Sequence, residues 1–150
     1  MAFSTADMEY RSITIGDYDQ LSALWKSIPG MGLRSLDDSR SGIEKYLRRN
    51  PTTSFAAVDN GKIIGCILGG HDGRRGFIYH TCVHPDHRGE GVGSRLVKLC
   101  CDALRAEGIT KCALVCYSTN ECGNDFWRSQ GWELRKDLNY FNLSLDENNT

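Results

Sequence analysis

Glycine alternates with other residues in one short stretch that could bind an anion. Gly89, Gly91 and Gly93 stand between an apolar segment and a segment with helical periodicity. The first amides of a helix have no partner inside the helix, and the helix dipole places partial positive charge there. Because glycine has no side chain, a phosphate can approach these amides, and Arg88 and Arg95 can add charge-assisted hydrogen bonds. The stretch predicts a phosphate site; the alternative is a strand-to-helix turn that happens to contain glycine.

Two common nucleotide-binding patterns do not fit this loop. The P-loop pattern G-x-x-x-x-G-K-[ST] is absent. The dinucleotide pattern G-x-G-x-x-G requires glycine at position 94, where the chain has Ser94. We therefore expect neither a P-loop NTPase nor a dinucleotide-binding enzyme.

Hydrophobic periodicity indicates the elements that position the loop. Alternating or continuous apolar runs predict strands at residues 10–15, 55–58, 63–69, 77–83, 112–117, 132–134 and 140–145. Helical spacing predicts helices after residue 17, between residues 41 and 50, between residues 92 and 107, and at 120–130. This order predicts the α/β (α+β) class, with one sheet and helices on its faces.

Length and charge limit the kind of protein. The chain has 150 residues, which suits a single domain over residues 1–150. Its formal net charge of −1 disfavours a nucleic-acid partner and a polybasic membrane-surface protein. The longest apolar run, Ile63–Gly70, is far shorter than the about 20 residues that cross a membrane, and the N-terminus lacks a secretory signal. We therefore expect no nucleic-acid or membrane partner.

The cysteines point to a reducing compartment. There are seven, an odd number, and they lie inside apolar runs. This usage is typical of free core thiols in the cytoplasm. No C-x-x-C pair is present, and His80, His84 and His87 fall across a strand end and a loop without a second segment rich in ligands. We expect a cytoplasmic protein without a metal site.

The complete pattern of the glycine loop carries a family resemblance. It is R-x-x-G-x-G at Arg88–Gly93, preceded by Val83 and Pro85. With this loop the chain closely resembles the GNAT superfamily of N-acetyltransferases, over about residues 9–145. The resemblance implies a single mixed, mostly antiparallel sheet of about six to seven strands flanked by four helices.

A second landmark strengthens the resemblance. Asn120 is followed by Phe126-Trp127 and by Gly131-Trp132, which is similar to the family's N…(F/L)Y…GF segment. Among the branches of the family, the chain looks most like small bacterial acetyltransferases of unassigned substrate. It is similar, more weakly, to ribosomal-protein N-terminal acetyltransferases.

The resemblance implies acetyl-CoA as the cofactor. Asn120 would hydrogen-bond its pantetheine region, and Trp127 would pack near the thioester. Strand divergence beside Val83 and Cys116 would leave a slot for the pantetheine arm. The strand residues whose backbone would pair with that arm are Thr81, Cys82 and Val83. The residues whose amides would hold the pyrophosphate are Arg88, Gly89, Glu90, Gly91, Val92, Gly93 and Ser94.

The resemblance further implies direct transfer of the acetyl group to a primary amine of a small molecule or peptide. A backbone amide near Thr81 would stabilise the oxyanion. The chain departs from the family at the acid and the base. Trp127 stands where a tyrosine acid is usual, and Phe77 and Val115 stand where glutamate is frequent. An indole cannot supply a proton as a phenol can, so a non-catalytic acetyl-CoA-binding or sensing module on the same fold is the alternative.

Three residues are candidates for the missing acid–base chemistry: Tyr79, His80 and Tyr117. Tyr79 shares a strand face with Phe77, and Tyr117 lies at the mouth of the splayed strands. His80 would face the other way unless a β-bulge re-aims it. Ordinary half-buried packing would also explain the tyrosines, and a hydrogen-bonded imidazole would also explain His80.

The acceptor is expected under the loop at residues 28–38, which proline and glycine make shapeable. Asp37 or Asp38 could hold a cationic amine. The alternative is that Asp38 or Ser39 caps the following helix. Proteins of this kind often form dimers, so a homodimer also fits the resemblance.

Overall fold

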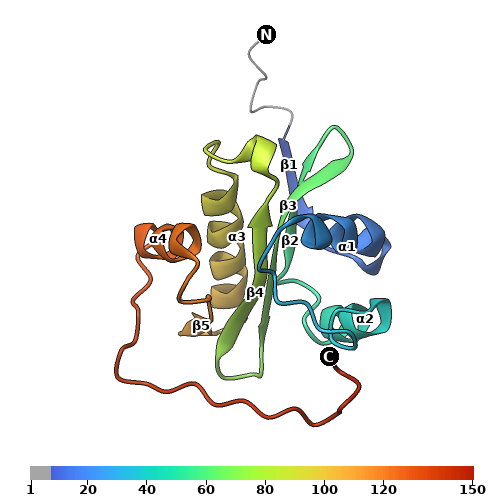
Figure 1. Cartoon of the computed structure of the whole chain (residues 1–150). Helices are drawn as coiled ribbons and strands as arrows, with labels where there is room; N and C mark the ends of the chain where they lie inside the picture. Colours follow the sequence, from blue (N-terminus) through green and yellow to red (C-terminus); the bar gives the residue numbers. More distant parts are fainter. Residues whose placement is uncertain (1–7) are drawn as a thin grey trace.

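The structure, a computed structural model, describes residues 8–150. Its centre is one sheet in the spatial order β1-β2-β3-β4-β5. Neighbouring strands are antiparallel except for β4 and β5, which are parallel (Figure 1). The strands are β1 (Met8–Ser12), β2 (Phe55–Asp59), β3 (Lys62–His71), β4 (Gly76–Val83) and β5 (Cys112–Leu114).

Helices cover both faces of the sheet (Figure 1). On one face lie α1 (Tyr18–Ser27) and α2 (Arg40–Arg49), and on the other lie α3 (Val92–Ala106) and α4 (Glu121–Ser129). Two short 3-10 turns, Ile15–Asp17 and Pro85–His87, precede α1 and α3. The predicted mixed, mostly antiparallel sheet and the four helices are confirmed in the described residues. None of these helices is both long and apolar enough to cross a membrane.

Two apolar cores hold the layers together. Leu21, Trp25 and Cys66 are buried where α1 packs on the sheet. Ile67 and Leu96 are buried where α3 packs on the opposite face. Ile67 follows Cys66 in β3, so alternation along one strand supplies both cores.

The predicted count of six to seven strands is wrong for the described residues, which form five. The expected strands at residues 132–134 and 140–145 are absent, and residues 133–148 are all exposed. Their sequence has the alternation of a strand, but a strand forms only where its backbone finds a partner. This segment runs outside the sheet and ends beside α2 (Figure 1).

The buried carboxylate of Asp17 fixes the position of the chain where α1 begins. Asp17 accepts two hydrogen bonds from the Arg11 guanidinium, at 2.8 and 2.9 Å, and one from the Thr14 amide at 2.9 Å. These hydrogen bonds, that of Arg11 above all, lower the pKa of the Asp17 carboxyl. The group therefore ties β1 to the first helix while it is ionised.

We expect Asp17→Asn to lower the free energy of unfolding by about 1–2 kcal/mol at neutral pH, because charged hydrogen bonds are lost. A carboxyl whose pKa is lowered in the folded state stabilises the protein at pH values above its ordinary pKa of about 3.9. This stabilisation is lost as the pH falls through the pKa of the folded state. Urea unfolding should therefore show a smaller difference in the free energy of unfolding between the wild type and Asp17→Asn at pH 3 than at pH 7. Asp19→Asn, at a side chain that is 93% exposed, is the control. A difference that does not change with pH would contradict this account.

Candidate active site

The pairing of β4 with β5 stops partway along β4, and the slot is defined here as the gap in the pairing beyond that point. Their pairing ends at Ile78 and Leu114, so the stretch Tyr79–Val83 of β4 has no strand partner on that side. Beyond the last pair, Val115 and Tyr117 are exposed. The expected strand divergence is therefore present, and backbone groups of β4 line it.

The glycine loop lies directly after the β4 side of this slot. Gly89 and Gly91 adopt φ values of +80° and +81°, and Gly91 is the N-cap of α3. A Cβ at either glycine would meet only open space. Among the described residues, no hydrogen-bond acceptor faces the amides of residues 89–94. The loop thus offers free donors at a helix N-terminus.

Gly93 allows α4 to pack closely against the start of α3. A Cβ at this position would lie 3.2 Å from the ring of Phe126, which belongs to α4. Gln130, the C-cap of α4, also donates a hydrogen bond of 2.9 Å to the Ser94 hydroxyl. These contacts hold α4 against the first turn of α3, beside the free amides.

Asn120 and Trp127 lie on the α4 side of the slot. Asn120 accepts a hydrogen bond of 2.9 Å from the Gly123 amide and so caps α4, which leaves its amide nitrogen without a partner among the described residues. Trp127 packs edge-on between Phe126 and Trp132, with ring centroids 5.1 and 5.0 Å away. Both residues therefore stabilise the fold, in addition to any contact with a ligand.

A β-bulge in β4 re-aims His80. In the register with β3, Cys66 faces Cys82 and Leu68 faces Tyr79, so one β3 residue stands opposite His80 and Thr81. His80 has a φ of +41°, a left-handed value that is unusual for a residue other than glycine. Simple alternation along β4 would place His80 and Tyr79 on opposite faces of the sheet. Because the bulge is present, both side chains lie on the α1–α2 face.

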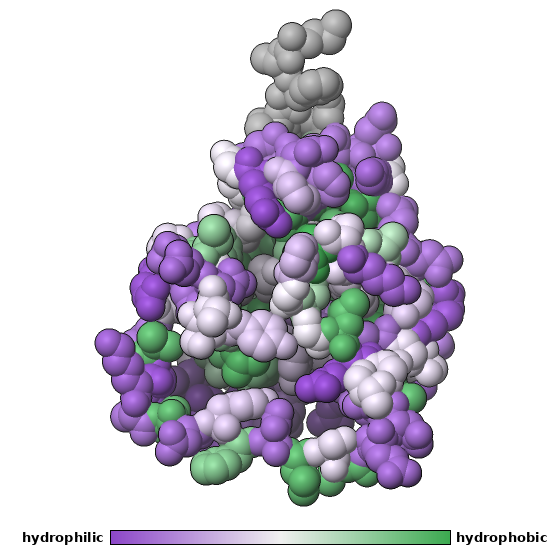
Figure 2. Space-filling view, viewed as in Figure 1, coloured by the Kyte–Doolittle hydropathy of each residue, from purple (hydrophilic) through white to green (hydrophobic). Residues whose placement is uncertain are grey.

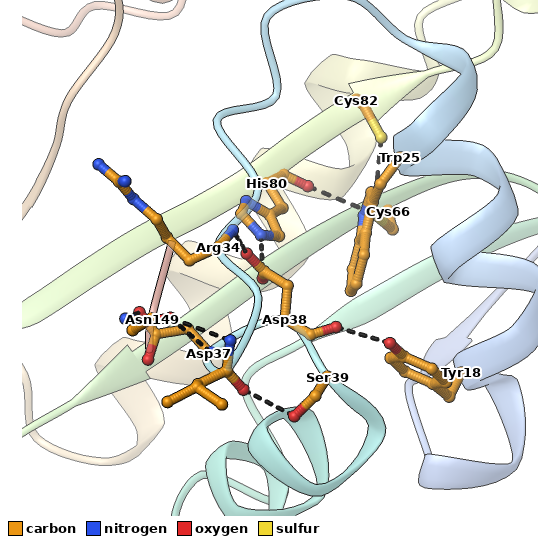
Figure 3. Close-up of polar contacts among 11 residues, drawn as sticks. Tyr18, Trp25, Arg34, Asp37, Asp38, Ser39, Cys66, His80, Cys82 and Asn149 are labelled. Atoms are coloured by element: carbon orange, nitrogen blue, oxygen red, sulfur yellow. Dashed lines mark hydrogen bonds and ion pairs between the residues drawn. The ribbon is translucent and has the colours of Figure 1, made fainter. Parts of the chain in front are cut away.

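The re-aimed ring meets an acidic partner that the sequence did not indicate (Figure 3). His80 Nε2 lies 2.5 Å from Asp38 Oδ1, and both side chains are nearly buried, at 12% and 11% exposure. Asp38 Oδ2 also accepts a hydrogen bond of 2.7 Å from the Arg34 amide. The His80 ring packs edge-on against Trp25, with centroids 4.9 Å apart. The pair connects the loop before α2 to the middle of the sheet.

Ser39, not Asp38, caps α2: its hydroxyl accepts a hydrogen bond of 3.1 Å from the Gly42 amide. Asp38 is therefore available to the imidazole. Since a carboxylate only accepts hydrogen bonds, His80 Nε2 carries the proton. In the neutral ring Nδ1 is then the basic nitrogen, and no described residue bonds to it.

The two tyrosine candidates lie on the same side. Tyr79 packs against Phe77 and Tyr46, and burial raises the pKa of its phenol, so the phenol stays protonated at neutral pH. The Tyr117 hydroxyl lies 3.2 Å from where a Cβ on Gly32 would stand, so it touches the predicted acceptor loop. The structure thus brings all three candidates to one face, over or beside the slot.

Thiols near the slot are poor nucleophiles. Hydrogen bonding with Cys66 and burial raise the pKa of the Cys82 thiol, and burial raises that of Cys116. Neutral thiols attack carbonyls slowly. Among residues 8–150, no cluster of three metal-ligating side chains occurs.

Comparison with known proteins fixes the family. Residues 18–132 match the model of the acetyltransferase (GNAT) family. An acetyltransferase of Pectobacterium atrosepticum is 34% identical over 114 residues, which cover 76% of this chain and 79% of that protein. The chain therefore belongs to the GNAT acetyltransferase family, as its loop and element order predicted.

Solved structures share the fold at lower identity. An aminoglycoside acetyltransferase from an uncultured soil metagenomic sample has a TM-score of 0.75 at 19% identity, covering 95% of this chain and 99% of that one. A predicted acetyltransferase of Clostridium acetobutylicum, solved with acetyl-CoA, has a TM-score of 0.70 at 17% identity, covering 90% and 96%. At these identities the likeness concerns the fold.

Proposed function

We propose that this chain is an acetyl-CoA-dependent N-acetyltransferase that acts on a primary amine of a small molecule or peptide, with residues 1–150 as one catalytic domain. The row of free amides at residues 89–94, directly after the slot, is the observation that carries the proposal. The Clostridium protein of the same fold was solved with acetyl-CoA, and the soil protein is an aminoglycoside acetyltransferase. Both facts support this donor and this class of acceptor.

The residues present suit the donor. The amides of residues 89–94 and the open space beside Gly89 and Gly91 fit a pyrophosphate. The unpaired backbone of Thr81–Val83 can extend along a pantetheine arm as a neighbouring strand does. The Thr81 hydroxyl is buried and has no partner among the described residues, which is costly unless a ligand or water satisfies it. When bound, the donor supplies an acetyl thioester.

His80 is the base that the geometry favours. Nδ1 would take the proton of the acceptor amine as the nitrogen bonds to the acetyl carbon, and the thiolate would leave with the electron pair of the broken C–S bond. The ring then releases its proton to solvent, and solvent protonates the thiolate. Asp38 is a positioning residue, because it holds the tautomer that leaves Nδ1 basic. Direct transfer is favoured over an acyl-enzyme because the slot thiols stay protonated.

A non-catalytic acetyl-CoA-binding module is the second candidate. It is motivated by Trp127, Phe77 and Val115, which replace the usual acid and bases. An amine panel, with CoA formation followed by chromatography, separates the two functions. Formation of CoA with any amine supports the enzyme, and binding of acetyl-CoA without CoA formation supports the module.

A cytoplasmic location belongs to the same proposal. All seven cysteines are free thiols, and two of them, Cys66 and Cys82, have sulfur atoms 3.7 Å apart without a bond. Thiols persist in a reducing compartment.

We expect Gly91→Glu to abolish acetyl-CoA binding, because it places a carboxylate in front of the free amides. Gly61→Glu is the matched control: it introduces the same side chain at a φ of +79° in open space at the β2–β3 turn. Titration calorimetry should show binding for the control and none for Gly91→Glu. A donor at 100 times its Kd should also stabilise the wild type by about 2.7 kcal/mol. Equal affinities in the two variants would refute the placement.

We expect His80→Gln to lower kcat about 10²–10⁴-fold, the range for loss of a general base, with little change in acetyl-CoA affinity. Asp38→Asn should lower kcat less and alter its pH profile, since it changes how the ring is held. Tyr79→Phe and Tyr117→Phe are the comparison variants. If either phenylalanine variant loses more activity than His80→Gln, the base is the corresponding tyrosine and the assignment fails.

A further inference from the structure

The C-terminal arm, defined as residues 133–148, runs from just beyond α4 to a point beside α2 (Figure 1). Every residue of the arm is exposed, and Figure 2 shows the surface hollowed between the arm and the body of the molecule. A cavity of about 470 Å³ separates Leu143 and Leu145 from Leu36 in the loop before α2. Because the arm packs loosely, the residues that follow it depend on hydrogen bonds for their position.

Asn149, directly after the arm, is half-buried and binds the loop before α2 (Figure 3). Its Oδ1 accepts hydrogen bonds of 3.0 Å from the Leu36 amide and 3.2 Å from the Asp37 amide. Its Nδ2 donates a hydrogen bond of 2.9 Å to Asp37 Oδ2. One side chain therefore uses both its oxygen and its nitrogen on two consecutive residues of the loop.

The chain on either side of Asn149 is held to Ser35. The Ser35 amide donates a hydrogen bond of 2.8 Å to the Thr150 carbonyl, and the Ser35 hydroxyl donates one of 2.6 Å to the Asn148 carbonyl. The Thr150 amide donates one of 2.9 Å to the Ser35 hydroxyl. Before them, the Asp146 carbonyl accepts from the Asn149 amide at 3.1 Å and closes a turn. Backbone contacts on both sides thus present Asn149 to the loop.

These contacts complete the hydrogen bonding of the turn at residues 34–38. The Arg34 amide donates to the Asp38 carboxylate, and the Asp38 amide donates to the Arg34 carbonyl at 3.0 Å, so the two ends of the turn bond to each other. Within residues 8–150, the three amides between them find acceptors only in Asn149 and Thr150. Water could satisfy these amides in many conformations of the turn, whereas Asn149 bonds to one.

The same turn carries the carboxylate that meets the imidazole. Asp38 follows Asp37 directly and uses its second carboxylate oxygen on His80. The Tyr18 hydroxyl donates a hydrogen bond of 2.6 Å to the Asp38 carbonyl, so Tyr18 and Asn149 hold the turn from two sides. His80 is fixed separately, by the bulge in β4. A change in the turn therefore moves the carboxylate relative to the ring.

We propose that Asn149 is a positioning residue of the candidate site, which holds the turn at residues 34–38 in the form in which Asp38 meets His80 Nε2. The inference rests on the proposed role of His80 as the base. Asn149 bonds to neither Asp38 nor His80 and acts on them only through the turn. When its contacts are lost, the carboxylate leaves the ring for part of the time, and Nδ1 is no longer always the basic nitrogen.

The first test is kinetic. Asn149→Ala should lower kcat about threefold to tenfold, the effect of losing hydrogen bonds that position a catalytic group, without a change in acetyl-CoA affinity. Asn148→Ala is the matched control, because only the backbone of Asn148 makes hydrogen bonds among the described residues. An unchanged kcat in Asn149→Ala, or an equal loss in both variants, would overturn the proposal.

An exchange of side chains tests the contact with Asp37. Asn149→Asp places two carboxylates against each other and should lower kcat at least as much as Asn149→Ala. Asn149→Asp/Asp37→Asn restores an amide opposite a carboxylate and should recover most of kcat, measured at saturating amine. A double variant as slow as Asn149→Asp would show that this contact does not position the site.

Nitrogen NMR of the imidazole reports on the pair without any activity, and the His80 signals are those absent from His80→Gln. With the ring neutral, the wild type and Asn148→Ala should show a protonated Nε2 and an unprotonated Nδ1, whereas Asn149→Ala should show shifts averaged between the two tautomers. Identical His80 shifts in the wild type and Asn149→Ala would reject the proposal even for an active enzyme. If no amine yields CoA, the proposed function fails, and the same spectra still decide whether Asn149 holds the pair.

Discussion

The site depends on the parting of β4 from β5 after Ile78 and Leu114. Up to that pair, the two strands satisfy each other's backbone groups in a parallel ladder. Beyond it, the β4 groups need another partner, since unpaired backbone inside a protein is costly. The glycine loop starts at the end of the freed stretch and turns its own amides outward. One interruption of the sheet therefore creates both an extended backbone surface and, at its end, a cluster of free amide donors.

The bulge at His80 links this slot to the loop before α2. A positive φ at a residue with a side chain is strained and persists only when its surroundings enforce it. Here the enforcing contacts are the Asp38 carboxylate and the Trp25 ring. Because Asp38 also accepts from the Arg34 amide, the same carboxylate shapes the expected acceptor loop. The position of the imidazole and the shape of that loop are consequently coupled through one side chain.

Local features were predictable from the sequence, and distant contacts were not. The glycine loop could be predicted because its pattern needs only consecutive residues at a helix start. The need for a bulge at His80 followed from period-two alternation, but the bulge itself has no local sequence signal. The sequence predicts only an amine ligand or a helix cap at Asp38, because the imidazole that Asp38 contacts is 42 residues away. The contact between Gly93 and Phe126 also has no local signal, because Phe126 lies in another helix.

The C-terminal arm shows the converse case, in which a correct local pattern did not produce the expected element. Residues 140–145 have the alternation of a strand, yet they form none. A strand is a property of a pair, so its sequence can specify the side chains and the exposed edge but not the chain that provides the second backbone.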